Sequence, residues 1–169
     1  VAQSRLPWQR YEKQRLPIST IRALRVFFRD KFIDRYSGSK LVFPGALMVV
    51  GQLMKDQFPM SPTWKVSESH IIFWELWPVI DHGEPVTRGG VHDESNFFTT
   101  SATNNIAKGH SRIEEIGWQL LPQADPEQQW DGLVSWYCRM VESDPTLLEH
   151  GQTKAWDTAL RNILRSQTK

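Results

Sequence analysis

The chain has 169 residues, 40% hydrophobic and 23% charged, a balance that is ordinary for a soluble globular protein with a buried core. Its single cysteine, Cys138, excludes an intramolecular disulfide and a zinc site built from cysteines. No apolar run approaches the ~20 residues of a membrane-spanning helix, and the first residues lack a signal-peptide core. We therefore expect a cytoplasmic protein with no membrane partner.

The net charge of +1 hides an uneven distribution. Residues 1–40 hold ten Lys and Arg against three Asp and Glu, a local charge of +7, whereas residues 41–169 carry −6. A basic first quarter indicates contact with a polyanion, and nucleic acid is the leading candidate. The alternative is a solvated helix face with no partner.

The first forty residues predict one helix after an irregular start. Residues 1–17 contain two prolines that interrupt regular structure. Ser19 or Thr20 can cap a helix that runs to about Tyr36, because apolar residues recur at helical spacing on one face. A second face carries three arginines that either line up against phosphates or remain solvated: Arg22, Arg25 and Arg29.

Other helices are predicted on both sides of a central stretch. Pro44 suits the first turn of a largely buried helix that continues to about Phe58. The aromatic residues between 63 and 77 do not decide between helix and strand. After the central stretch, amphipathic patterns predict helices over about 130–142 and 153–166, separated by Pro145.

The central stretch, residues 78–108, predicts a strand, a long loop, a second strand and a short helix. Val79 and Ile80 suit a strand that ends at His82, and a loop rich in Gly and Pro follows. Residues 96–100 read as the returning strand, and Ser101 or Thr103 can cap a helix to about Lys108.

The residues of this stretch fit phosphodiester hydrolysis. His82 can take a proton from water, and Asp81 beside it can bind a divalent cation. Neighbours on a strand point to opposite faces, so both can serve one site only near the strand end. Asn105 can supply a second oxygen ligand, and the side chain of Asn96 can tie the loop together through backbone hydrogen bonds.

In this stretch the chain resembles the HNH endonuclease family, which is built on the ββα-metal fold. The matching elements occur in order: Asp81-His82, Pro85, Gly89-Gly90, Asn96-Phe97, and Asn105 with Lys108. Asn105 rather than Asn104 fits the pattern, because it lies nine residues after Asn96. The resemblance covers residues 78–108 only.

The resemblance implies an α+β fold, with the ββα-metal core flanked by N- and C-terminal helices. It implies that His82 is the general base, that Asp81 and Asn105 bind one divalent metal, and that Asn96 holds the loop. Mg²⁺ is the expected ion, with Mn²⁺ or another divalent ion as alternatives. The products would carry a 5′ phosphate and a 3′ hydroxyl.

The chain departs from many family members in one respect. The family often brackets this motif with Cys-x-x-Cys pairs that bind structural zinc, but here the second pair of positions is Ser101 and Asn104. We therefore expect no structural zinc, so packing must hold the motif together. Three more cations in or after the motif can each contact phosphate or be surface charges: Arg88, Lys108 and Arg112. His92 and His110 can assist metal or DNA binding, but we expect both to be solvent-exposed.

These expectations divide one compact domain into a basic helical region (1–65), a ββα-metal core (66–113) and a C-terminal helical region (114–169). The predicted function is a metal-dependent endonuclease that hydrolyses double-stranded DNA, of the restriction or defence type, and a homodimer if its site is palindromic. The alternatives are a non-cleaving nucleic-acid-binding module on an HNH scaffold, and an HNH nuclease that acts on RNA.

Overall fold

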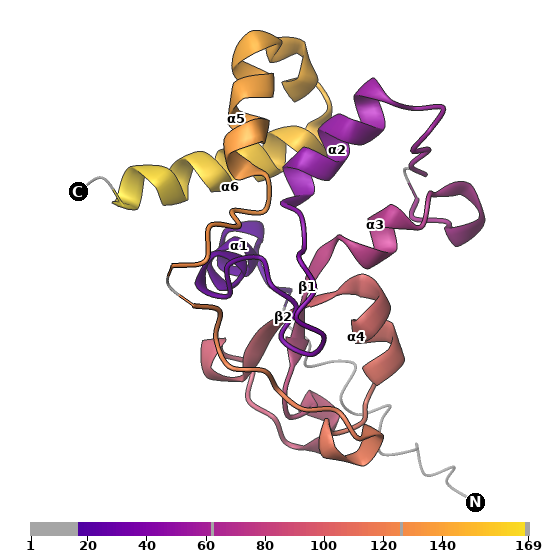
Figure 1. Ribbon diagram of the computed structural model, residues 1–169, viewed down its shortest axis with the longest axis vertical. Helices are drawn as coiled ribbons and strands as arrows, with labels where there is room; N and C mark the ends of the chain where they lie inside the picture. The colour runs from indigo at the N-terminus through magenta and orange to yellow at the C-terminus, as the bar shows by residue number, and fades with distance from the viewer. Residues whose placement is uncertain (1–16, 62, 126, 168–169) are drawn as a thin grey trace, which may run out of the picture.

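The computed structural model describes residues 17–61, 63–125 and 127–167. Within them the fold is α+β, with a two-stranded antiparallel sheet and six α-helices. The elements are α1 (Thr20–Arg29), α2 (Pro44–Leu53), α3 (Ile72–Glu75), β1 (Pro78–His82), β2 (Phe97–Ser101), α4 (Ala102–Lys108), α5 (Val134–Ser143) and α6 (Gly151–Gln167). In Figure 1 the sheet and α4 occupy the lower half, α2, α5 and α6 the upper half, and α1 lies between.

Helix α1 begins as predicted and ends earlier than predicted. The hydroxyl of Ser19 accepts a hydrogen bond from the amide of Arg22, which makes Ser19 the N-cap. The predicted continuation to Tyr36 is wrong, because Lys31 and Phe32 have φ angles of 55° and 53°, in the left-handed region that ends a helix. This turn buries Phe32 in the core.

The other predicted helices are present with shifted ends. Helix α2 stops at Leu53 rather than at about Phe58, and α5 starts at Val134 rather than at about Trp130. Helix α6 closely matches its prediction. Residues 63–77 contain the short helix α3 and a 3₁₀ turn at Val66–Glu68. The irregular structure predicted for residues 1–17 concerns residues that, apart from Pro17, lie outside the described ranges.

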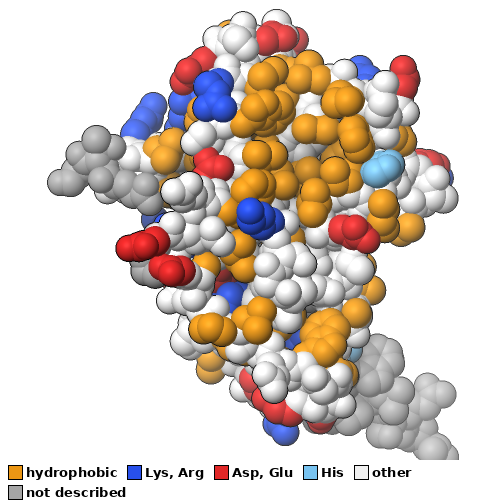
Figure 2. Space-filling model, in the orientation of Figure 1, with side chains coloured by type: hydrophobic (Ala, Val, Ile, Leu, Met, Phe, Trp, Pro, Cys, Tyr) orange, Lys and Arg blue, Asp and Glu red, His pale blue; other side chains and the backbone are white. Residues whose placement is uncertain are grey.

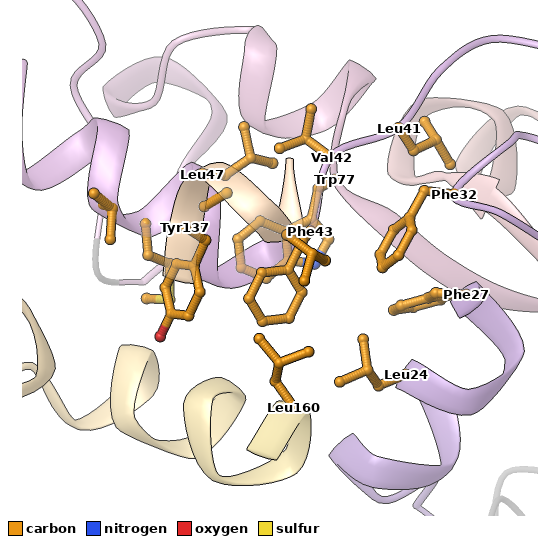
Figure 3. Close-up of a cluster of buried hydrophobic side chains, with 14 of the residues drawn as sticks. Leu24, Phe27, Phe32, Leu41, Val42, Phe43, Leu47, Trp77, Tyr137 and Leu160 are labelled. Carbon is orange, nitrogen blue, oxygen red and sulfur yellow. The ribbon is translucent and has the colours of Figure 1, made fainter. Parts of the chain in front are cut away.

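One buried cluster joins segments that are far apart in the sequence. Leu24 and Phe27 of α1 belong to one cluster with Leu47 of α2, Tyr137 of α5 and Leu160 of α6 (Figure 3). Each of these five side chains is at most 2% exposed. Trp77, the residue before β1, is buried in the same cluster. Residues from all three predicted regions of the chain therefore contribute to a single core.

Some large apolar side chains remain at the surface. Leu53 and Met54, at the end of α2, are 51% and 43% exposed, and hydrophobic atoms gather over the upper half of the face in Figure 2. No helix in the described ranges combines the length and apolar character needed to cross a bilayer.

Candidate active site

The strands β1 and β2 and the helix α4 follow one another as a ββα unit. His82 pairs with Phe97 across the sheet, and Asp81 pairs with Phe98. Ser101 ends β2 and caps α4, since its hydroxyl accepts a hydrogen bond from the amide of Asn104. This unit brings the predicted base and ligand residues into one part of the molecule.

His82 lies at the end of β1 and is 6% exposed. Its Nε2 atom is 3.1 Å from Nδ1 of His92, and both rings meet the edge or face of Phe97. His82, His92 and Asn105 line one hollow of about 400 Å³ beside β1 and α1. The expectation that His92 is solvent-exposed is wrong, because the loop folds this residue back onto His82 and buries its Nε2 atom.

Asn96 braces the loop between the two strands. Its side-chain oxygen accepts a hydrogen bond from the amide of Glu84, and its side-chain nitrogen donates to the carbonyl oxygens of Glu84 and Val91. Gly90 is required by this arrangement, because a Cβ atom there would lie 1.9 Å from the carbonyl oxygen of Glu84. The closed loop carries His92 to His82.

Asp81 points away from His82, toward a different set of partners. Its Oδ2 atom is 2.9 Å from the ammonium of Lys108 and accepts a hydrogen bond of 2.5 Å from the hydroxyl of Tyr36. Lys108 also donates to the carbonyl oxygen of His82. Burial, together with the charge of Asp81 and the hydrogen bond to it, raises the pKa of Tyr36 well above its ordinary value. Tyr36 is therefore a proton donor to Asp81 at neutral pH.

Two oxygen donors in the unit remain open to a cation. Within the described residues, Asp81 Oδ1 and the side chain of Asn105 make no hydrogen bond or ion pair. A carboxylate and an amide oxygen are donors of the type Mg²⁺ prefers, with waters completing its shell. Asp81 does not line the hollow that contains Asn105, and Lys108 already neutralises its charge. The donor types fit one divalent cation, which would have to compete with Lys108.

No group of three or more His, Cys, Asp or Glu side chains is arranged to hold a metal ion within residues 17–61, 63–125 and 127–167. The predicted ligand set is of another kind, since it contains one carboxylate and one amide.

Two buried carboxylates attach the ββα unit to the segment after α1. Asp34 accepts hydrogen bonds from the hydroxyl of Thr100, the amide of Ser101 and the side chain of Asn104. Asp30 accepts one from the amide of Thr99. The sequence carried no signal for these contacts beyond two aspartates four residues apart, with Phe32 and Ile33 between them. They supply part of the packing that holds the unit without cysteines.

The three arginines of α1 do not form one row of exposed, unpaired charges. Arg29 donates to the carbonyl oxygens of Glu94 and Phe97, at 2.9 and 2.6 Å. Arg22 lies over the ring of Phe97, 4.8 Å from its centre, and donates to the carbonyl oxygen of His92. Both therefore hold the loop against α1. Arg25 is exposed, and no hydrogen bond or ion pair joins it to the loop within the described residues.

The three cations of the motif also differ from one another. Lys108 is 2% exposed, so its ammonium is not a surface charge in this structure. Arg88 pairs with Glu115 at 2.5 Å, and Arg112 pairs with Glu84 at 3.0 Å. These exposed pairs contribute little to stability, so either arginine can exchange its partner for a phosphate at small cost.

Comparisons with protein-family models, with curated proteins and with solved structures found no match for this chain.

Proposed function

We propose that the protein is a divalent-metal-dependent endonuclease that hydrolyses DNA phosphodiester bonds, as the resemblance to the HNH family implies. The observation that carries this proposal is the position of His82 at the end of β1, in the same hollow as Asn105 and next to a loop held closed by Asn96. A buried, oriented imidazole beside an open hollow suits a general base.

His82 would act through its contact with His92. A hydrogen bond between two ring nitrogens needs a proton on one of them, and that choice decides which nitrogen of His82 is basic. The tautomer of His82 therefore decides which of its nitrogens can accept the proton of the attacking water. Asn96 keeps the loop, and with it His92, in the position that this requires.

Asp81 and Asn105 are the proposed ligands of the divalent cation, although Asp81 does not line the hollow that contains Asn105 in this structure. When bound, the cation would offset charge on the scissile phosphate and on the departing 3′ oxygen. Tyr36 and Lys108 hold Oδ2 of Asp81 and fix the orientation of its carboxylate.

Cleavage of supercoiled plasmid in Mg²⁺ or Mn²⁺ tests the proposal. We expect nicked and linear products with 5′ phosphates, loss of cleavage in His82→Ala, and retained DNA binding in that variant. His150→Ala removes an exposed histidine outside the ββα unit and is the matched control. Absence of cleavage of DNA and RNA with every divalent ion would refute the nuclease assignment, and cleavage of RNA alone would change the substrate.

A further inference from the structure

A second hollow, of about 640 Å³, lies between α1, α6 and residues 128–131. The chain after α4 passes beside α1 before it enters α5 (Figure 1). Arg25, Phe28 and Arg29 of α1 line this hollow, whereas Thr20, Ala23 and Phe27 line the hollow of His82. These two sets lie on opposite sides of one helix.

The lining of this hollow is predominantly positive. Arg25 and Lys31 line it, and within the described residues neither is in an ion pair. Arg29 adds a third cation, which Asp30 partly neutralises. The one acid in the lining, Asp131, accepts hydrogen bonds from two amides at the start of α5. The lining therefore has two uncompensated cations and one acid that is already hydrogen-bonded.

Two aromatic side chains belong to the same lining. Phe28 and Trp130 line the hollow, and the ammonium of Lys40 lies 5.3 Å from the centre of the Trp130 ring. Gln128 and Gln129 are exposed at the rim and offer amide donors and acceptors. Cations for phosphates, aromatic faces for bases and amides for base edges are the combination that binds a nucleic-acid strand.

We propose that this hollow is a nucleic-acid-binding site separate from the candidate active site. Arg25 and Lys31 contact backbone phosphates, and Phe28 and Trp130 contact a base. The proposal rests on the proposed function for the identity of its ligand, and it extends that function by giving an unpaired strand of the nucleic acid a second contact, away from the bond that is cut.

Binding without cleavage tests this site. The protein used is His82→Ala, and the probe is a fluorescently labelled single-stranded DNA of twenty nucleotides, titrated over a series of salt concentrations. Adding R25Q and K31Q together should weaken binding about tenfold and lower the slope of log K against log salt by about 1.4, since each phosphate contact contributes about 0.7 on a single strand. An oligonucleotide of the same length with abasic sites should bind His82→Ala about tenfold more weakly than the intact one.

The matched control is the pair R139Q and K154Q in the same His82→Ala background, which removes two exposed positive charges outside the hollow. This pair should leave the salt slope nearly unchanged. Equal losses in both pairs would overturn the site in favour of a general effect of net charge, and unchanged binding in R25Q/K31Q would also overturn it. If polyglutamate competes for the site as well as unlabelled DNA does, the ligand class is acidic chains and the nucleic-acid assignment is overturned. If the abasic strand binds as tightly as the intact one, the contact between the aromatic residues and a base is overturned.

Plasmid cleavage by the wild-type protein separates this proposal from the proposed function. If the wild type cuts plasmid but R25Q/K31Q does not weaken binding, the nuclease stands and the second site fails. If the wild type cuts nothing while binding depends on Arg25 and Lys31, the second site stands and the nuclease fails.

Discussion

Lys108 and Asp81 form a buried ion pair, with the ammonium nitrogen 2.9 Å from Oδ2 of the carboxylate. The Lys108 side chain is 0% exposed and that of Asp81 is 8% exposed. The same ammonium donates to the carbonyl oxygen of His82, so one side chain links the predicted base and the predicted ligand.

Breaking this pair should be costly. Lys108→Met leaves a buried carboxylate without its counter-charge, and we expect a loss of about 3–5 kcal/mol in the free energy of unfolding. Urea denaturation followed by tryptophan fluorescence measures it. The double variant Asp81→Leu/Lys108→Met should lose less than Lys108→Met alone, because no unpaired charge remains. A single variant as stable as the wild type would contradict the buried pairing.

Removal of the second ligand should weaken the response to metal. A ligand that binds only the folded state raises its stability, by about 2.7 kcal/mol at a hundred times Kd. Mn²⁺ should therefore raise the Tm of the wild type, and Asn105→Ala should reduce that rise. Asn162→Ala, the same change at an exposed site on α6, should behave as the wild type does. An equal rise in Tm for both variants would remove Asn105 from the ligand set.

Two substitutions of Asn96 should destabilise the protein to different extents. Asn96→Ala leaves the amide of Glu84 and two carbonyl oxygens without their partner, at a cost of at least about 1 kcal/mol. Asn96→Asp should be worse, because it directs a carboxylate oxygen at the carbonyl oxygens of Glu84 and Val91. Thermal unfolding followed by circular dichroism tests this order, with Asn162→Asp as the control. The reverse order would show that the donated hydrogen bonds contribute little.

The raised pKa of Tyr36 predicts a loss of stability in alkali. Above pH 10 the tyrosine of the unfolded chain loses its proton while that of the folded chain keeps it. The contribution is thus complete below pH 10 and declines above it, with a slope of up to about 1.4 kcal/mol per pH unit. Tyr36→Phe should show a shallower decline between pH 9.5 and 11.

Tyr137 contributes to the same pH range and should account for part of the remaining slope, together with the thiol of Cys138, whose pKa is also raised by burial. Its pKa is also raised, by burial and by Asp157. Tyr137→Phe is therefore the companion variant. In the double variant, the reductions in the slope of the free energy of unfolding against pH should add. If Tyr36→Phe declines as steeply as the wild type, the hydroxyl of Tyr36 does not remain protonated beside Asp81.

Substitutions of Arg29 and of Arg25 should have different effects on the free energy of unfolding, although both residues lie on α1. Arg29→Met removes charge-assisted hydrogen bonds to two carbonyl oxygens of the loop, and we expect a loss of about 1–3 kcal/mol. Arg25→Met should change the free energy of unfolding by less than about 0.5 kcal/mol, as is usual for an exposed side chain. Urea denaturation of both variants tests this contrast, and equal losses would contradict it.

Much of the local structure could be predicted from sequence alone. The order strand, loop, strand and helix over residues 78–108 matches β1, β2 and α4 closely, and Ser101 is one of the two predicted caps. The loop-closing hydrogen bonds of Asn96 reach at most twelve residues along the chain. These features follow from side-chain periodicity, glycine positions and capping, which act over a few residues.

Tertiary structure decided the partners of the buried polar groups. Tyr36 reaches Asp81 from 45 residues away, and Asp34 reaches Ser101 from 67 residues away. These contacts also coincide with the early end of α1, since Asp30 and Asp34 meet β2 only because the chain leaves the helix. A buried charge or hydroxyl needs a partner, but which group provides it depends on how distant segments pack. The sequence by itself therefore determined the residue types and local elements of the candidate site, whereas long-range packing decided that Lys108 faces Asp81 and that α1 holds the loop carrying His92 against His82.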